Sequence, residues 1–160
     1  MNPHVECADC HNPHMATAQL NTGTYVTIGS TLLGTPGVTI TGTNIDRALH
    51  EYEVCFRCHG DGAVPVQRKI QRQALTENLR LDFNPGNTSF HPLVVSSLSE
   101  DAPSLVPELP RGSLIRCTDC HNNDAGRRAG GSGPDGPHGS NYEYLLERNY
   151  ETLDDTIESE

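Results

Sequence analysis

The sequence predicts a mostly irregular chain with short α-helices and a small β-hairpin, built without a conventional hydrophobic core. Three observations lead to this class. Only 34% of the 160 residues are hydrophobic, there are three Phe and no Trp, and the chain contains 15 Gly and 11 Pro. Such a chain needs disulfides, metal ions or a bulky cofactor to hold one shape. The six cysteines are the candidates to supply that support.

The charge and hydropathy of the chain exclude several classes of protein. Its formal net charge is −10 and its 11 Lys and Arg are scattered, which argues against a nucleic-acid-binding protein. No apolar run reaches the roughly 18 residues that a membrane span needs. The first residues lack the basic start and apolar stretch of a secretion signal, so we expect either a signal already removed or a segment of a longer protein.

The first half of the chain predicts most of the regular structure. A short helix is expected over 15–20. Residues 23–45 alternate β-branched residues with Thr and Gly around a central Thr-Pro-Gly, which predicts a hairpin with one exposed face. A helix is expected over 46–59, opening with a capping Asp46, and another over 64–81, starting after Pro65.

The second half is expected to be mainly loop. Residues 84–113 are rich in proline and predict an irregular, ordered segment, and the glycine-rich stretch 122–140 predicts a second loop. A short amphipathic helix is expected over 141–153, followed by a solvated acidic end. No solenoid period is present, because the cysteine motifs are unequally spaced.

All six cysteines occur in three C-x-x-C-H motifs. In this pattern two thiols, three residues apart, add to the two vinyl groups of one haem, and the next imidazole binds the iron from the same turn. The sequence therefore predicts three covalently attached haem c groups, wrapped by a single domain over residues 1–160. The motifs are Cys7, Cys10 and His11 (7–11); Cys55, Cys58 and His59 (55–59); and Cys117, Cys120 and His121 (117–121).

Zinc ribbons, a thioredoxin-like redox pair and disulfides are the alternative readings of C-x-x-C. Zinc needs four ligands and hence an even number of motifs, whereas this chain has three, each followed by His. Haem attachment is the favoured interpretation. It also explains the composition, since three macrocycles would replace the missing core and folding would depend on their attachment.

The five remaining histidines are candidates for the second axial position of each iron. Two imidazoles close an iron, whereas one leaves it open to small molecules. His14 lies too close to His11 to reach the far side of the same haem, so we expect it to bind a neighbouring iron. His91 and His138 lie beside prolines on irregular chain that can present an imidazole. These three are the predicted distal ligands.

Two further histidines exceed the number needed. His50 precedes the second motif by five residues, and His4 precedes the first by three. Both are additional candidates, and His4 could reach an iron in an adjacent subunit. Met1 and Met15 are less favoured, because Met ligation raises the potential and histidines are in sufficient supply.

The motif residues resemble the multihaem c-type cytochromes of metal-reducing and related anaerobic prokaryotes, with CxxCHNPH, FHP and GPHGS…LL elements. The resemblance covers 4–14, 50–60, 89–93, 117–121 and 136–146. It implies little regular structure, stacked bis-histidine haems, and a place in the periplasm or outside the cell. Some members polymerise into extracellular filaments in which a histidine of one subunit ligates a haem of the next.

The chain departs from this group in its low density of haems. Three motifs in 160 residues is sparse, and the hairpin region and the 84–113 segment are more protein than haem wrapping requires. Extra surface of this kind could form subunit contacts. It could equally have no role in assembly, so the expectation of a filament depends partly on analogy.

The expected function is electron transfer by a secreted, low-potential triheme protein without catalytic residues. Its expected partners are further copies of itself, joined head to tail, and other cytochromes or extracellular electron acceptors. The alternatives are a haem reductase, for example of nitrite, with one open axial site; a soluble periplasmic shuttle; and one domain of a larger electron-conducting complex.

Overall fold

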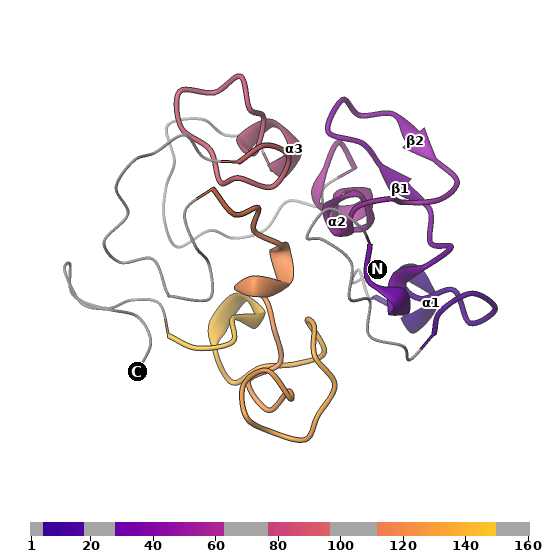
Figure 1. Cartoon of the computed structure of the whole chain (residues 1–160), viewed down its shortest axis with the longest axis vertical. Coiled ribbons are helices and arrows are strands. Elements are labelled where there is room, and N and C mark those ends of the chain that lie inside the picture. Colours follow the sequence, from indigo (N-terminus) through magenta and orange to yellow (C-terminus); the bar gives the residue numbers. More distant parts are fainter. Residues whose placement is uncertain (1–4, 18–27, 63–76, 97–111, 150–160) are drawn as a thin grey trace. The chain divides into compact units, whose positions relative to one another are not determined.

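The computed structural model describes residues 5–17, 28–62, 77–96 and 112–149 (Figure 1). The chain divides into two compact units, Met1–Val95 and Ser96–Glu160. The first unit contains two cysteine motifs and the second contains one. Most described residues lie in coil and turns, with short helices and one two-stranded antiparallel sheet. The predicted class of an irregular chain with short helices and a small hairpin is confirmed at this level.

The hairpin is shorter than predicted and turns at a different place. Strand β1 is Gly37–Val38 and β2 is Asn44–Ile45, with Gly37 opposite Ile45. The turn runs over 39–43, where Thr39 N donates to the Thr43 carbonyl (2.9 Å) and Gly42 takes a φ of +85°. The predicted centre of the hairpin at Thr-Pro-Gly is therefore wrong, because Gly42 provides the left-handed backbone conformation that the turn needs.

Part of the predicted hairpin upstream of β1 is a turn of helix. Residues Ser30–Leu32 form one turn of 3₁₀-helix instead of a strand. The predicted hairpin residues 23–27 lie outside the described residues. The expected helix over 15–20 is absent from its described part, 15–17, and 18–20 lies outside the described ranges.

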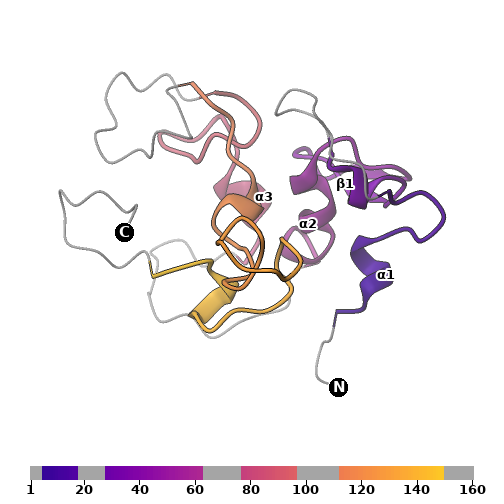
Figure 2. The same ribbon diagram turned by 60° about the horizontal axis from the view of Figure 1, so that its bottom comes forward.

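Helix α2, Glu51–His59, is the longest in the described chain and begins five residues later than predicted. The carboxylate of Glu53 sets this start: its Oε2 accepts the backbone N–H groups of Leu49 (2.7 Å) and His50 (2.9 Å). A glutamate at the third helical position caps the residue before the helix. His50 therefore occupies the N-cap in place of the predicted Asp46, and α2 packs beside β1 and α3 (Figure 2).

Helices α1, Cys7–Cys10, and α3, Leu79–Asp82, have one turn each. Most of the helix predicted over 64–81 lies outside the described residues. Its described end is not continuous, because Asn78 has extended dihedrals and its side chain accepts the N–H of Arg80 (3.1 Å). This capping interaction begins α3 as a new helix.

The second unit has only single turns of 3₁₀-helix within its described residues, Cys117–Asp119 and Glu143–Leu145. The amphipathic helix predicted over 141–153 is wrong for 141–149. Tyr144 and Leu145 have φ values of +59° and +56°, which a right-handed helix cannot contain. Residues 150–153 lie outside the described ranges, and the glycine-rich segment 122–140 is irregular as predicted.

The two units differ in what they bury. Among the described residues, the buried hydrophobic side chains all lie in the first unit: Ile28, Ala48, Tyr52, Val54, Phe56 and Leu93. Within 112–149 the buried residues are Asn122, Gly126 and Gly136, so this stretch buries no hydrophobic side chain. Hydrophobic burial therefore contributes little to the shape of the described part of the second unit. None of the helices in the described ranges has the length and apolar character needed to cross a bilayer.

Candidate functional site

Each cysteine motif lies in a turn that brings its histidine back toward its first cysteine. The first motif forms α1 and the third forms the 3₁₀ turn of the second unit. In both, the histidine N–H donates to the carbonyl of the first cysteine, from His11 to Cys7 and from His121 to Cys117, each at 2.8 Å. The second motif occupies the last part of α2. None of the six cysteines forms a disulfide.

The imidazoles of the first and third motifs share one hydrogen-bonding arrangement. His11 Nδ1 lies 2.9 Å from the Thr31 carbonyl oxygen, and His121 Nδ1 lies 2.8 Å from that of Tyr144. A carbonyl oxygen only accepts, so Nδ1 must be the donor, and the neutral ring then carries its lone pair on Nε2. Histidines that ligate metals are oriented in this way.

The loop that carries Thr31, the acceptor for His11, is hydrogen-bonded to the first motif and to the chain that follows it. The 3₁₀ turn that contains Thr31 is joined to the chain after the motif by a bond from Thr17 N to the Ser30 carbonyl (3.0 Å). Thr35, which is buried, donates its hydroxyl to the Cys10 carbonyl (2.9 Å). The loop over 28–35 therefore orients both the imidazole and one cysteine of the motif.

The acceptor for His121 comes from a strained turn. Tyr144 and the following Leu145 both have positive φ, a region that costs a non-glycine residue roughly 1–2 kcal/mol. Their side chains are more than 40% exposed, so packing offsets little of this cost. The Glu147 N–H also donates to the Cys120 carbonyl (2.9 Å), which ties the end of the same segment to the motif.

The first two motifs lie side by side in the first unit. Arg57, inside the second motif, donates from Nη1 to the carbonyl oxygen of Asp9, inside the first. Burial raises the pKa of the Cys10 thiol, and the negative charges of Cys58 and Asp9 raise it further, while Arg57 opposes them. Figure 2 shows α1 next to α2. Groups attached to these two motifs would therefore be neighbours.

The third motif is held by the charged residues around it. Asp119 accepts the backbone N–H of Arg116 (2.7 Å) and forms an ion pair with Arg128 (3.1 Å) from the glycine-rich loop. Arg128 also donates to the Thr118 carbonyl (3.2 Å). The two residues between the cysteines thus anchor the loop that leads to His138.

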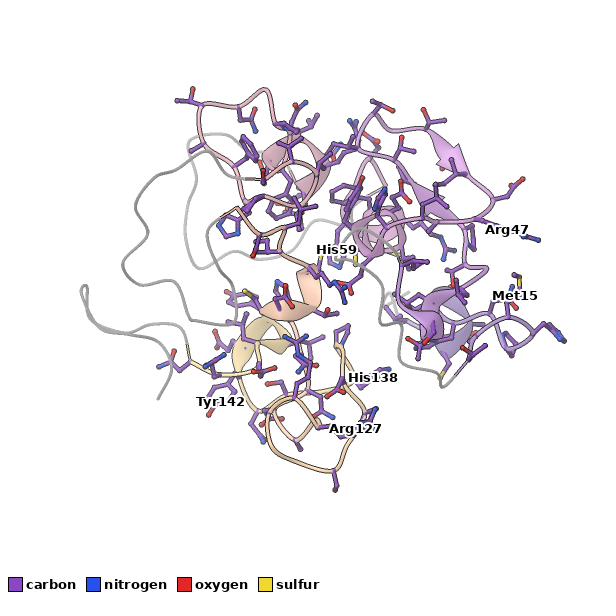
Figure 3. All side chains as sticks on the ribbon, in the orientation of Figure 1. Met15, Arg47, His59, Arg127, His138 and Tyr142 are labelled. Atoms are coloured by element: carbon purple, nitrogen blue, oxygen red, sulfur yellow. The ribbon has the colours of Figure 1, made fainter. Side chains whose placement is uncertain are left out.

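The predicted distal histidines are placed on irregular chain, and three of them are exposed: His14, His91 and His138. His138 and the second-motif His59 are labelled in Figure 3. His50 is half-buried at the N-cap of α2 and stacks on Tyr52 with ring centroids 5.2 Å apart. His4 lies outside the described residues. The Met15 side chain packs on Gly34, where an added Cβ would overlap its sulfur.

A row of aromatic rings crosses the first unit between two candidate ligands. Beyond the stacked pair of His50 and Tyr52, the row continues through Phe56, Phe83 and His91, with centroids 5.4, 6.5 and 6.0 Å apart. Phe56 belongs to the second motif and is 1% exposed. Burial raises the pKa of Tyr52 to about 12, and the charge of Glu53 adds to this shift. The second motif is therefore built into the apolar part of its unit.

Two residues that the sequence reasoning missed connect motifs to candidate ligands. Asn12 and Asn122 directly follow the motif histidines. Asn12 Oδ1 accepts the His14 N–H (3.0 Å), and Asn122 Oδ1 accepts the Gly136 N–H, two residues before His138. The shared order Cys-His-Asn at the end of both motifs was the available signal.

A zinc site would require a cluster of ligands, and the described part of the chain contains none. Within the described ranges, which include all six cysteines, no three His, Cys, Asp or Glu side chains gather as a metal site. A structural zinc site needs four ligands. Comparisons with protein-family models, with curated proteins and with solved structures find no match to this chain.

Proposed function

We propose that this chain is a triheme c-type cytochrome that transfers electrons through three bis-histidine haems. The observation that carries the proposal is the paired arrangement at His11 and His121. In each case the imidazole follows two reduced cysteines in one turn, and its Nδ1 donates to a carbonyl oxygen. Nε2 is then the nitrogen that would bind iron. The residues present therefore fit the group that the motifs imply.

Each of the three motifs would hold one haem. Their cysteine pairs would form the thioether bonds, and His11, His59 and His121 would be the first axial ligands. His14, His91 and His138 would be the second, with His50 and His4 as further candidates. A bis-histidine haem supplies one-electron transfer at low potential, without an open site for a substrate. The chain's residues orient the imidazoles of His11 and His121.

The distribution of buried side chains supports the same proposal. Described residues 112–149 contain a complete motif but bury no hydrophobic side chain. A flat apolar macrocycle bound to the motif would give this stretch a surface to pack against. Small domains that lack a core of their own depend on such support.

Location and partners follow from the chemistry and the resemblance. Haem is joined to thiols outside the reducing cytosol, so the proposed location is the periplasm or the cell exterior. The proposed partners are other cytochromes or extracellular electron acceptors. As a variant, the chains assemble head to tail into a conductive filament, in which His4 of one copy ligates a haem of the next.

The decisive experiment is the intact mass of the purified natural protein. We expect the polypeptide mass plus three haem groups, with six-coordinate low-spin spectra in both redox states. A polypeptide without added porphyrin mass would overturn the proposal. Carbon monoxide tests the reductase alternative: a spectral response of the reduced protein would reveal an open iron, whereas no response supports pure electron transfer. Electron micrographs distinguish filaments from single molecules.

A further inference from the structure

We propose that Asn12 and Asn122 are positioning residues, which hold the segments bearing His14 and His138 in place for iron binding. This inference rests on the proposed function and adds a role that the motif pattern does not contain. Each asparagine follows a proximal histidine, so its amide is anchored to the motif itself. An asparagine amide can accept from one backbone and donate to another, and so can join two chain segments.

Asn12 performs both tasks in the first unit. Its Oδ1 accepts the His14 N–H at 3.0 Å, and its Nδ2 donates to the Gly34 carbonyl at 3.1 Å. Gly34 has a φ of +76°, and a Cβ at this position would overlap Met15. The segment carrying His14 is therefore packed closely on the loop that also orients His11.

Asn122 also joins two segments of the second unit, where it is completely buried, but it donates to a side-chain carboxylate instead of a backbone carbonyl. Its Nδ2 donates to Glu147 Oε2 at 2.5 Å, and its Oδ1 accepts the Gly136 N–H. The His138 N–H in turn donates to the Gly136 carbonyl at 2.8 Å. A short chain of hydrogen bonds thus connects the residue after His121 to the backbone of His138.

The physical benefit is preorganisation of an exposed ligand. A histidine on irregular, exposed chain loses conformational freedom when it binds iron, and this loss weakens ligation. An amide that holds the backbone of the ligand segment beforehand reduces that loss. The second motif is followed by Gly60 instead of Asn, so we expect an asparagine to position the ligand segment at only two of the three motifs.

The first test uses Asn12→Ala in the complete haem-loaded protein. The side chain of Asn12 is only partly buried, so the smaller residue should be accommodated. We expect all three haems to stay covalently attached by mass, while the reduced form gains a carbon monoxide response equal to one haem. Asn87→Ala is the matched control, because this exposed amide donates to the carbonyls of Leu81 and Asp82 and to no motif segment.

The second test exchanges the two partners of the buried pair. Asn122→Asp would place a carboxylate against Glu147 and should make one haem reactive to carbon monoxide. The double variant Asn122→Asp, Glu147→Gln restores one donor and one acceptor and keeps the acceptor for Gly136. We expect it to return to the unreactive low-spin spectrum of the starting protein.

The outcomes separate this inference from the proposed function. If the starting protein carries three haems but Asn12→Ala and Asn122→Asp leave every haem unreactive, the positioning role is wrong and the cytochrome stands. If the exchange variant behaves like Asn122→Asp alone, the role of Asn122 is likewise wrong. If the starting protein carries no haem, the proposed function itself fails.

Discussion

The guanidinium of Arg57 donates a hydrogen bond to the backbone carbonyl of Asp9, although the two residues are 48 positions apart in the chain. Each lies between the two cysteines of its motif. The chemistry that would join haem to a C-x-x-C-H motif uses neither of the two residues between the cysteines, so it places no requirement on Asp9 or Arg57. Here they connect two motifs and, on the proposed function, would set the spacing of two haems.

Replacing Arg57 with Met should loosen this connection. A hydrogen bond with a charged partner contributes about 1.5–3 kcal/mol, and partial exposure reduces this, so we expect a loss of about 1 kcal/mol in the free energy of unfolding. Loss of the cation should also lower the potentials of the two nearby haems, because positive charge disfavours the ferric state. Spectroelectrochemical titration and denaturant unfolding measure the two effects.

Arg80 supplies the matched control for this variant. It pairs with Asp61 at 2.6 Å in the same unit, and the hydrogen bonds of Arg80 hold the pKa of Asp61 below its ordinary value. Arg80→Met also removes one cation from the first unit, but the hydrogen bonds of Arg80 go to Asp61, two residues after His59, and to the Ile40 carbonyl, so they do not join the two motifs. If it shifts the haem potentials as much as Arg57→Met does, the proposed link between motifs is not the cause.

The strained turn at Tyr144 predicts opposite effects for two substitutions. Glycine adopts a φ of +59° without steric cost, so Tyr144→Gly should preserve the bond to His121 and raise stability by about 1 kcal/mol. Proline is restricted to a φ of about −65°, so Tyr144→Pro should turn the backbone carbonyl of residue 144 away from His121 and break this hydrogen bond. A proximal imidazole without this bond is less basic and stabilises ferric iron less well.

The measurement is the potential of each haem in the two variants. We expect one of three potentials to rise in Tyr144→Pro and none to change in Tyr144→Gly. Equal potentials in both variants, with His121 still bound, would show that the Tyr144 carbonyl does not tune this ligand.

Tyr52 predicts a loss of stability at alkaline pH. Burial raises its pKa to about 12, above the value of about 10 in an unfolded chain. The neutral phenol is therefore favoured in the folded state; its contribution is complete below about pH 10 and is lost as the pH rises to about 12.

The Tyr52→Phe variant isolates this effect, because it keeps the ring in the aromatic row and removes the titrating group. Its free energy of unfolding should fall less steeply over the same pH range than that of the starting protein. Parallel pH profiles for the two proteins would contradict the assignment.

Removal of one cysteine pair tests whether haem attachment supports the fold. Cys55→Ala with Cys58→Ala should yield a chain that proteases cut rapidly in the first unit, because the packed residues around α2 would lose the group bound to the motif. Cys117→Ala with Cys120→Ala is the reciprocal control and should direct cleavage to the second unit. Limited proteolysis with mass mapping locates the cuts, and full resistance of both variants would refute the dependence.

The order of residues alone predicts haem attachment at three motifs and the local turn that each motif forms. A C-x-x-C-H motif places two thiols and an imidazole within one turn, and the hydrogen bonds from His11 to Cys7 and from His121 to Cys117 show this local geometry. The low apolar content likewise predicted mostly irregular chain. Element boundaries were less predictable: Glu53 moved the start of α2, and Gly42 moved the hairpin turn, because one favourable contact outweighs a weak propensity.

The partners of the motifs depended on the folded chain. Thr31 lies 20 residues from His11, Tyr144 lies 23 from His121, and Asp9 lies 48 from Arg57. The acceptors at these positions are backbone carbonyls, which every residue possesses, so no residue type marks them in the sequence. Spacing along the chain predicts the chemistry of a motif within one turn, whereas the contacts that orient a motif and connect it to another arise only when distant segments meet.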